Sequence, residues 1–340
     1  MNFLQNAWYM AAWAEELGPD TLLPRTILSQ RIVFYRDANG SVRALADRCS
    51  HRLVPLSKGR RHGNDLQCPY HGLRFGLDGH CTHNPHGDGR IAPNAAIRAF
   101  VAEERDMAIW VWMGKAALAD PALIPDYSIL ATAPETARMH GMLHIAASYQ
   151  LLSDNIMDLS HVDYLHADTL GGGWIPRSRV SIREGDRSLT VKWAVDSDAV
   201  AANFASEMPD PTAPAEQYMQ VTWTAPSAMA LTVHIERPGD APLVSNAFHS
   251  MTPETPITSH YFYGNCRSWR RDDAEYNVVK ERAITRIFVE EDKPMVEDQQ
   301  REIGDADIFD HNPLVLSTDK GAIRVRRKLA AMIRAEQALS

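Results

Sequence analysis

Short runs of residues that suit β-strands dominate the first third of the chain. Residues 31–36 and 41–45 form two such runs, and Asn39-Gly40 lies between them. Asn-Gly between β-type runs is a strong hairpin signal, because both central residues of a type I′ turn need positive φ. A second hairpin is indicated at Asp78-Gly79, and residues 107–112 predict a further strand. The pattern therefore predicts a small all-β domain.

Beyond about residue 120 the pattern mixes helical and strand periodicities. A loop rich in Ala, Asp and Pro around residues 120–126 marks a domain boundary. Apolar residues recur at helical spacing over residues 149–166, before Pro294, and over residues 325–333. The β-type runs of this part are residues 189–193, 219–223, 230–235 and 259–263. The sequence predicts an all-β domain over residues 1–120 and an α+β domain over residues 121–340.

Composition adds limits on function. The 340 residues are 45% hydrophobic and 23% charged, as is typical of a globular protein. A net charge of -8 provides no basic excess of the kind that nucleic acid binding needs. The longest apolar run, residues 7–14, is too short to cross a bilayer, and no basic leader or cleavage pattern precedes it. We expect a cytoplasmic protein that binds neither nucleic acid nor membranes.

Metal-binding residue types are concentrated in one short segment. Three of the four cysteines and six of the fourteen histidines lie between residues 49 and 86. They include two pairs, Cys49-x-His51 and Cys68-x-x-His71, each accompanied by turn-forming or small residues. A zinc site would place all four side chains around one tetrahedral ion. A Rieske [2Fe-2S] cluster would place the two thiolates on one iron and the two imidazoles on the other.

The order of these residues favours the cluster. Common zinc fingers have two cysteines followed by two histidines, whereas each pair here is a cysteine followed by a histidine. Four matched positions also argue against ordinary core cysteines and surface histidines. The segment therefore indicates a Rieske cluster, with zinc as the alternative.

A second polar group lies in the helical segment over residues 149–166. Asn155, Asp158 and His161 follow one another at steps of three, so an α-helix places them on one broad face. Both His161 and His166 can reach one metal only if the helix ends or bulges between them. Two histidines and a carboxylate form the facial triad of non-haem Fe(II) oxygenases, whose third ligand would come from elsewhere in the chain. A satisfied polar patch on the helix is the alternative.

Together these motifs indicate a family. Besides the Cys/His pairs, the segments that carry the resemblance are Asn6-Ala-Trp-Tyr9, Cys68-Pro-Tyr-His71-Gly-Leu73, Asp154-Asn-Ile-Met-Asp-Leu159, Thr252-Pro-Glu-Thr255 and Glu291-Asp292. Over nearly its whole length the chain resembles the oxygenase components of Rieske non-haem iron oxygenases, of the vanillate and dicamba O-demethylase type. The resemblance implies an all-β Rieske domain followed by an α+β catalytic domain with an antiparallel sheet and helices.

The resemblance also implies two cofactors and their ligands. The implied ligands of the [2Fe-2S] cluster are Cys49, His51, Cys68 and His71, and those of a mononuclear Fe(II) are His161, His166 and Asp292. Asp292 is chosen over Glu291 on the family pattern alone. Acidic residues crowd this stretch, as they do on a solvated helical face.

Two further residues have implied roles beside the iron. Asp158 is expected to bridge His161 and the partner subunit's His71 by hydrogen bonds, and Asn155 is expected close to the iron. In the family the two metal centres of one chain lie too far apart for electron transfer. The resemblance therefore implies a homotrimer assembled head to tail.

The implied reaction is a monooxygenation with O2. Electrons come from a separate reductase, directly or through a ferredoxin, and a methoxylated aromatic acid is O-demethylated to a phenol and formaldehyde. Ring or methyl hydroxylation by the same machinery is one alternative, and a Rieske electron carrier without catalytic iron is another. Residues 227–234 are largely apolar, and His249 is the candidate for a hydrogen bond to a substrate carboxylate or phenol.

Overall fold

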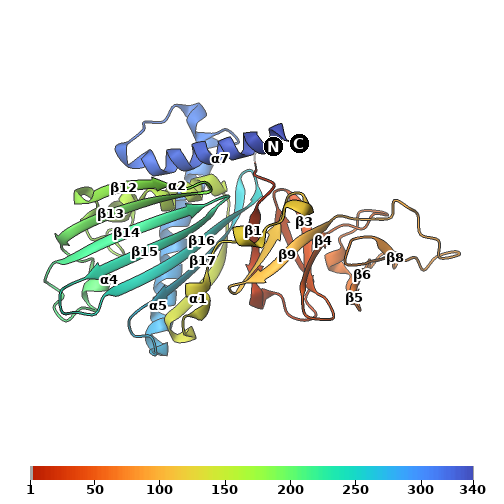
Figure 1. Ribbon diagram of the computed structural model, residues 1–340, viewed down its shortest axis with the longest axis horizontal. Coiled ribbons are helices and arrows are strands. Elements are labelled where there is room, and N and C mark those ends of the chain that lie inside the picture. Colours follow the sequence, from red (N-terminus) through yellow and green to blue (C-terminus); the bar gives the residue numbers. More distant parts are fainter. Residues whose placement is uncertain (1–2, 340) are drawn as a thin grey trace. The chain divides into compact units, whose positions relative to one another are not determined.

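The computed structural model describes residues 3–339, and the chain divides into two compact units (Figure 1). The first unit runs through Ile124 and also takes in Pro253–Thr255. The second comprises Pro125–Thr252 and the residues from Pro256 onward. The short segment joins the first unit because the backbone N–H groups of Leu28 and Ser29 donate to the carbonyls of residues 253 and 254, at 2.9 and 2.8 Å. No local sequence pattern marks this long-range pairing.

The first unit is all-β, as predicted. Within the described residues it contains a six-stranded sheet of order β1-β10-β9-β4-β3-β2 and a four-stranded sheet of order β5-β6-β7-β8. The strands are β1 (Trp8–Trp13), β2 (Leu23–Ile27), β3 (Gln30–Arg36), β4 (Val42–Ala46), β5 (Arg60–His62), β6 (Asp65–Gln67), β7 (Arg74–Phe75), β8 (Cys81–His83), β9 (Ala99–Arg105) and β10 (Ala108–Trp112). All residues of β1 and β10 are buried, although β1 is an edge strand of the larger sheet.

Both predicted hairpins are present, but the first turn differs from the prediction. Gly40 has a φ of 82°, whereas Asn39 is not at positive φ, so the turn is not type I′. The loop between β3 and β4 is longer, and the Asp37 carboxylate accepts hydrogen bonds from the backbone N–H groups of Asn39 and Ser41 at 2.9 and 3.0 Å. Gly79, also at 82°, lies in the second hairpin, between β7 and β8.

The second unit is built on one large antiparallel sheet. Its order within the described residues is β11-β17-β16-β15-β14-β13-β12. The strands are β11 (Arg138–Ile145), β12 (Arg179–Glu184), β13 (Ser188–Asp198), β14 (Ala215–Thr224), β15 (Ala228–Glu236), β16 (Leu243–Thr255) and β17 (Thr258–Arg267). Buried and less buried residues alternate along β13 and β14, as a sheet with one covered face requires.

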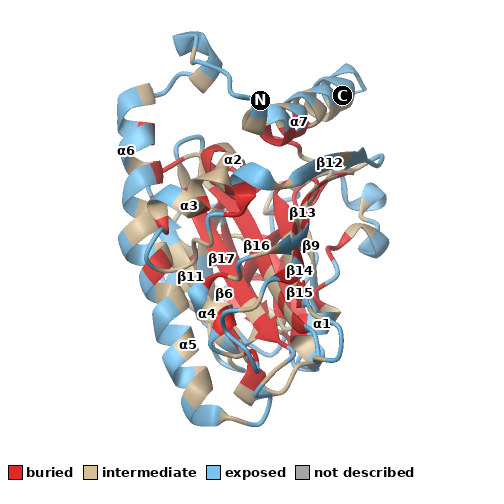
Figure 2. Ribbon diagram, turned by 90° about the vertical axis from the view of Figure 1, so that its left-hand side faces the viewer, coloured by how far each residue is buried: buried red, intermediate tan, exposed pale blue. Residues whose placement is uncertain are grey.

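Helices pack on this sheet. They are α1 (Ser128–Thr132), α2 (Tyr149–Met157), α3 (Val162–Leu165), α4 (Ala202–Ala205), α5 (Ala274–Ile287), α6 (Lys293–Ile303) and α7 (Lys320–Ala338). Short 3-10 turns are η1 (Ala14–Glu16), η2 (Leu56–Lys58), η3 (Ala116–Leu118), η4 (Pro121–Leu123), η5 (Glu135–Ala137), η6 (Leu159–His161), η7 (Ile175–Arg177), η9 (Ile308–His311) and η10 (Ser317–Asp319). Figure 2 shows the buried strands beside α2 and α5. None of the described helices is long and apolar enough to cross a bilayer.

The helix predicted before Pro294 does not end there. The chain widens into a π-helix, η8 (Phe288–Asp292), and continues directly into α6. Proline lacks an N–H, and its ring collides with a carbonyl of the preceding turn in a regular α-helix. The wider turn accommodates Pro294, and it also places Asp292 at its end. π-Turns of this kind often occur at functional sites.

The two hairpin glycines provide a matched test of backbone geometry. Both have a φ of 82°, but an added Cβ at Gly79 would lie 2.1 Å from the carbonyl oxygen of Ile97, whereas one at Gly40 would meet nothing within 4 Å. We expect Gly40→Ala to cost about 1 to 2 kcal/mol of unfolding free energy, from the left-handed conformation alone. Gly79→Ala should cost about 1 to 3 kcal/mol more, because backbone must move. Denaturant unfolding checks this, and equal losses in the two variants would contradict it.

Candidate metal centres and substrate cavity

The two Cys/His loops of the first unit have the same backbone design. In each, the cysteine N–H donates to the carbonyl five residues later, and the N–H four residues later donates back to the cysteine carbonyl. These distances are 2.8 and 3.0 Å for Cys49, and 2.8 and 3.1 Å for Cys68. The fourth residue after the cysteine has positive φ in both loops, at Leu53 (59°) and Gly72 (75°). Two matched turns therefore present two matched pairs of side chains.

Their side chains are divided between the interior and the surface. Cys49 and Cys68 are each 2% exposed, while His51 is exposed and His71 half-buried. The two imidazole rings lie with their centroids 4.6 Å apart. Burial raises the pKa of Cys49, and the neighbouring Cys68 adds to this. Two adjacent inner thiols and two adjacent outer imidazoles fit the two unlike irons of a Rieske cluster.

A further histidine supports this site. The Nε2 of His86 lies 2.8 Å from the backbone carbonyl oxygen of His71, so it donates a hydrogen bond to the second loop. No sequence pattern singles out His86 among the neighbouring histidines. Its contact is long-range in the chain and visible only in the fold.

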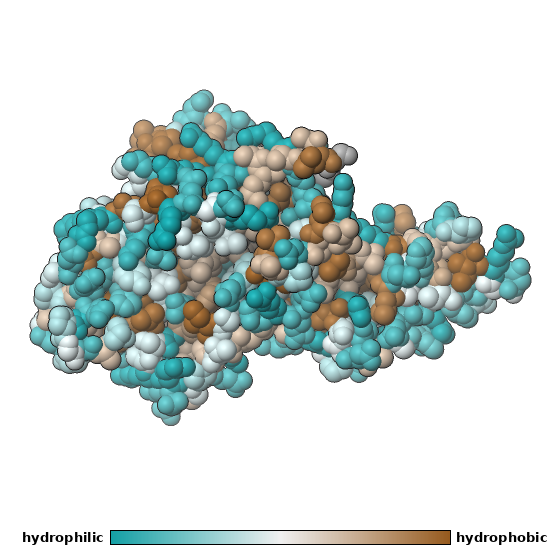
Figure 3. Space-filling view, viewed as in Figure 1, coloured by the Kyte–Doolittle hydropathy of each residue, from teal (hydrophilic) through white to brown (hydrophobic). Residues whose placement is uncertain are grey.

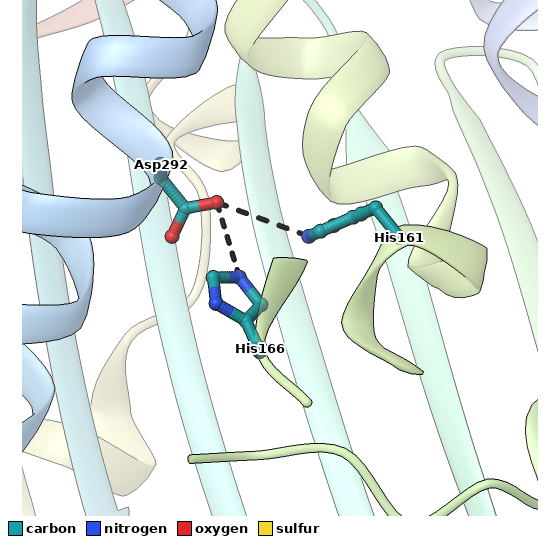
Figure 4. A group of neighbouring side chains, drawn as sticks. All are labelled: His161, His166 and Asp292. Atoms are coloured by element: carbon teal, nitrogen blue, oxygen red, sulfur yellow. Dashed lines mark ion pairs between the residues drawn. The ribbon is translucent and has the colours of Figure 1, made fainter. Parts of the chain in front are cut away.

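In the second unit, His161, His166 and Asp292 converge (Figure 4). One ligand atom from each lies within 4.8 Å of the others. The Oδ1 of Asp292 is 3.2 Å from His166 Nε2 and 3.8 Å from His161 Nε2. Two imidazole nitrogens and one carboxylate oxygen directed at a common point fit a facial triad for Fe(II). Side chains from η6, from the residue that follows α3 and from η8 thus meet at one centre.

The helix that carries the histidines is broken at Asp158. α2 ends at Met157, and Asp158 has φ -116° and ψ 90°, outside the helical region. Its carboxylate accepts a hydrogen bond from the N–H of Ser160 at 2.9 Å and so begins the next turn. The prediction that Asp158 shares a helix face with Asn155 and His161 is therefore wrong. The predicted helix end between His161 and His166 is confirmed, because α3 ends at Leu165.

Backbone and side-chain contacts orient the two imidazoles. His161 Nδ1 lies 2.6 Å from the backbone carbonyl of Asp158, so Nδ1 carries the proton and Nε2 is left as a ligand. Burial lowers the pKa of His161, which favours this neutral form. His166 Nδ1 lies 2.6 Å from Glu291 Oε2, to which the Thr169 hydroxyl also donates at 3.0 Å.

The two adjacent acids therefore face different nitrogens of one ring. Burial lowers the pKa of His166, but its hydrogen bonds with Asp292 and Glu291 outweigh burial, and the pKa is raised. A divalent cation between the imidazoles would balance these two carboxylates. Asn155 Nδ2 donates to Asp292 Oδ1 at 3.2 Å and helps to hold that carboxylate in place. The role of Glu291 as a partner of His166 was missed in the sequence.

A cavity of about 150 Å³ opens from this centre. A cavity of about this size accommodates a benzene ring in another protein. Its apolar lining includes Ile156, Leu159, Leu231, Val233, Ile284 and Phe288. An aromatic ring can therefore lie against the three converging side chains with its apolar faces covered.

His249 lines the same cavity and is held by Tyr261. It is 2% exposed, its Nδ1 lies 2.8 Å from the Tyr261 hydroxyl, and the two rings are stacked. The Tyr261 hydroxyl has no other hydrogen-bond partner among the described residues. We assign it as the donor, because the opposite direction would leave both its O–H and His249 Nε2 buried without partners, and this places the proton of His249 on Nε2. Nε2 is buried without a partner. The cavity thus contains one unused neutral donor.

Glu291 should contribute to iron affinity without ligating the iron. We expect Glu291→Gln to weaken iron binding about 10- to 100-fold, as is usual when the carboxylate partner of a ligand histidine is lost. Iron retained against a graded series of chelator concentrations measures this. Glu290→Gln is the matched control, because Glu290 is largely exposed and pairs with Arg286. Equal retention in the two variants would rule out this role for Glu291.

Comparisons with known proteins agree with both centres. A model of the Rieske [2Fe-2S] domain matches residues 7–99, and a model of the vanillate O-demethylase oxygenase C-terminal domain matches residues 145–335. These matches confirm the predicted cluster and the predicted enzyme class. They leave no place for a zinc-stabilised module.

Similar proteins cover the chain from end to end. The chloroacetanilide N-alkylformylase oxygenase component of Rhizorhabdus wittichii is 38% identical, over 98% of this chain and 97% of that protein. The dicamba O-demethylase oxygenase component of Stenotrophomonas maltophilia is 35% identical, over 99% and 100%. The crystal structure of dicamba monooxygenase bound to 3,6-dichlorosalicylic acid has a TM-score of 0.90 at 34% identity, covering 99% of this chain and all of that one. The chain therefore belongs to the Rieske non-haem iron oxygenases, as an oxygenase component of the vanillate O-demethylase type.

Proposed function

We propose that this protein is the terminal oxygenase of a multicomponent monooxygenase that O-demethylates a methoxylated aromatic acid. The observation that carries the proposal is the group of His161, His166 and Asp292 at one end of an apolar cavity of ring size. An electron carrier has no need of such a cavity. O-demethylation is chosen because the family model is that of an O-demethylase and a relative that covers the whole chain is one.

The residues divide the work between ligation and substrate binding. Cys49, His51, Cys68 and His71 hold the cluster, and His161, His166 and Asp292 hold the iron. Bound there, the two cofactors supply electron transfer and O2 activation, chemistry that no side chain provides. The apolar walls hold the ring and exclude water from the reacting methyl group.

In this proposal His249 donates a hydrogen bond to the ether oxygen that carries the reacting methyl group. Hydroxylation of that methyl group gives a hemiacetal, which collapses to formaldehyde and a phenol. The unpartnered Nε2–H of His249 donates to the ether oxygen and then to the phenol oxygen that leaves. Burial lowers the pKa of His249 to about 4, so the imidazole stays a neutral donor at neutral pH.

The assembly we propose is a head-to-tail homotrimer. Leu53 and Tyr70 lie beside the cluster ligands and are 62% and 60% exposed. In the second unit a groove lined by Asp158 and His161 also includes Leu314 and Val315, which are 85% and 54% exposed. Figure 3 shows apolar surface on the segment between α6 and α7. If the patch beside the cluster of one subunit covers the patch beside the iron ligands of the next, the partner subunit's His71 comes close to Asp158. Electrons then have a short path from cluster to iron.

The remaining partners follow from the family. Two of the relatives are named as oxygenase components, so a reductase, directly or through a ferredoxin, is the electron donor we propose. None of the four cysteines, all of them within the described residues, forms a disulfide, which suits the reducing cytoplasm.

A substrate screen tests the reaction. Purified protein containing both metals is supplied with O2 and a compatible reductase system, and with methoxybenzoates, methylbenzoates and N-alkyl anilides. We expect formaldehyde and a phenol from a methoxybenzoate, with O2 uptake matched to product. If the products are only hydroxymethyl or ring-hydroxylated compounds, the enzyme is a hydroxylase and the proposed demethylation is wrong. Substrate-independent O2 uptake without any product would contradict an oxygenase role.

Tyr261→Phe tests the proposed donor without touching the substrate. The variant removes the hydroxyl that fixes the proton of His249 on Nε2. We expect binding of a methoxybenzoate to weaken about 2- to 10-fold, the worth of one neutral hydrogen bond. Binding of the matched ethylbenzoate, which has no ether oxygen, should stay unchanged.

The pH dependence provides a second readout of the same donor. With a pKa near 4, His249 does not titrate between pH 5 and 8, so it should add no transition to binding in that range. An equal loss for both ligands in the Tyr261 variant would contradict the role of His249. So would a binding transition near pH 6.5 that disappears in His249→Gln.

A further inference from the structure

The cavity has a second polar region that the metal centre does not use. Lys280, Arg267 and Asn203 all line it, in the middle of α5, at the end of β17 and in α4. These residues are polar or charged, whereas most of the cavity wall is apolar. Placing two cations beside an apolar cavity is costly unless an anion meets them.

Two elements place this region far from the metal ligands. β17 and α5 run along the cavity in opposite directions, since Tyr263 Oη lies 3.1 Å from Thr285 Oγ1 and Arg267 donates to Asn277 Oδ1 at 2.5 Å. Lys280 lies between these two contacts, twelve residues before Asp292. The intervening chain is α-helix up to Ile287 and π-helix from Phe288, so the two backbone positions lie about three helical turns apart. The cations therefore lie at the end of the cavity remote from the iron ligands.

The two cations at this end lack acidic partners. Among the described residues neither Lys280 nor Arg267 has a carboxylate within ion-pair distance, because the nearby Glu207 pairs with Arg270 at 2.9 Å. The ammonium of Lys280 lies 3.5 Å from the Asn203 carbonyl and 5.4 Å from the centre of the Tyr276 ring, and the Arg267 guanidinium lies 4.9 Å from the same ring. Burial is also the first cause of a lowered pKa for Lys280.

Unused hydrogen-bonding atoms lie at the same place. Arg267 is 8% exposed, and its two terminal nitrogens bond the Asn277 side chain and the carbonyls of Thr136 and Arg270. Its Nε is buried without a partner, and so is the side-chain oxygen of Asn203. Buried polar atoms in folded proteins are rarely left unpaired, so the Arg267 N–H points to a missing acceptor, whereas the Asn203 oxygen calls for a donor and does not bear on an anion.

We propose that Lys280 and Arg267 form an anion subsite that binds the acid group of the aromatic substrate. The inference rests on the proposed function, because the methoxy group at the iron ligands defines the other end of the bound molecule. The acid group accepts from the Lys280 ammonium and from Arg267 Nε–H. An acid group opposite the methoxy group on the ring lies farther from the iron ligands, and so nearer to the two cations, than an adjacent acid group does. The preferred substrate class is therefore a 4-alkoxy aromatic acid.

Binding of small aromatic ligands to the holoenzyme tests this by calorimetry, with no turnover. The probes are 2-, 3- and 4-methoxybenzoate and the uncharged methyl 4-methoxybenzoate. Lys280→Met removes the charge and keeps the length of the side chain. Arg282→Met is the matched control, since Arg282 is exposed on the same helix and does not line the cavity.

The wild type should bind 4-methoxybenzoate most tightly of the three acids. Lys280→Met should weaken that binding about 10- to 100-fold, as expected for the loss of a charge-assisted hydrogen bond. In the same variant the affinity for the ester should stay within threefold of the wild-type value. The Arg282 variant should bind acid and ester as the wild type does. Unchanged binding of the acid by Lys280→Met would overturn the proposal. So would equal losses for acid and ester, or tightest binding of 2-methoxybenzoate.

The binding data also separate this subsite from the reaction. If no methoxyarene yields formaldehyde but the acid binds and Lys280→Met loses it, the subsite stands and the demethylase function fails. If formaldehyde forms from acid and ester alike and Lys280→Met binds both as the wild type does, the function stands and the subsite fails.

Discussion

One carboxylate oxygen joins the parts of the catalytic unit. The Oδ1 of Asp292 lies within 3.8 Å of nitrogens from Asn155, His161 and His166. These partners come from α2, the short turn after it and the end of α3, whereas Asp292 belongs to a helix more than 120 residues later. Such a shared acceptor is stable only if a cation or donors surround it, because an unpaired buried carboxylate is costly. The three ligands can therefore meet only if the late helices pack against the early ones, and this packing in turn brings the partners of the Asp292 carboxylate into place.

Two local departures from regular helix make this meeting possible. Asp158 leaves the helical region, and its own carboxylate begins the next turn, which redirects His161. Five residues of π-helix before α6 widen the late helix where it passes the histidines. A straight α-helix would carry His161 and His166 on different faces. Both departures are fixed by side chains in the sequence, Asp158 as a cap and Pro294 as a breaker of regular helix.

The sequence predicted what is local and missed what is long-range. The two Cys/His pairs and the helices around Tyr149 and Val325 were predictable, because the signals lie within a few residues of one another. β11, β12 and β16 have no clear local signal and are specified by their neighbours in the sheet. The choice between Asp292 and Glu291 is of the same kind. Adjacent acids in a helix look alike in a sequence, and only the fold shows that one faces Nε2 of His166 and the other Nδ1.

The distribution of charge along the cavity bears on how a substrate is oriented. At the metal end, a divalent ion would be balanced by Asp292 and Glu291, so that end offers an acid group little net attraction. At the other end, Lys280 and Arg267 have no carboxylate of their own among the described residues. The middle of the cavity is apolar and makes charge placement there unfavourable. A monoanionic aromatic molecule therefore has one favourable direction, with its acid group remote from the iron and its uncharged substituent against it. Specificity of this kind comes as much from the penalty for the reversed orientation as from attraction in the correct one.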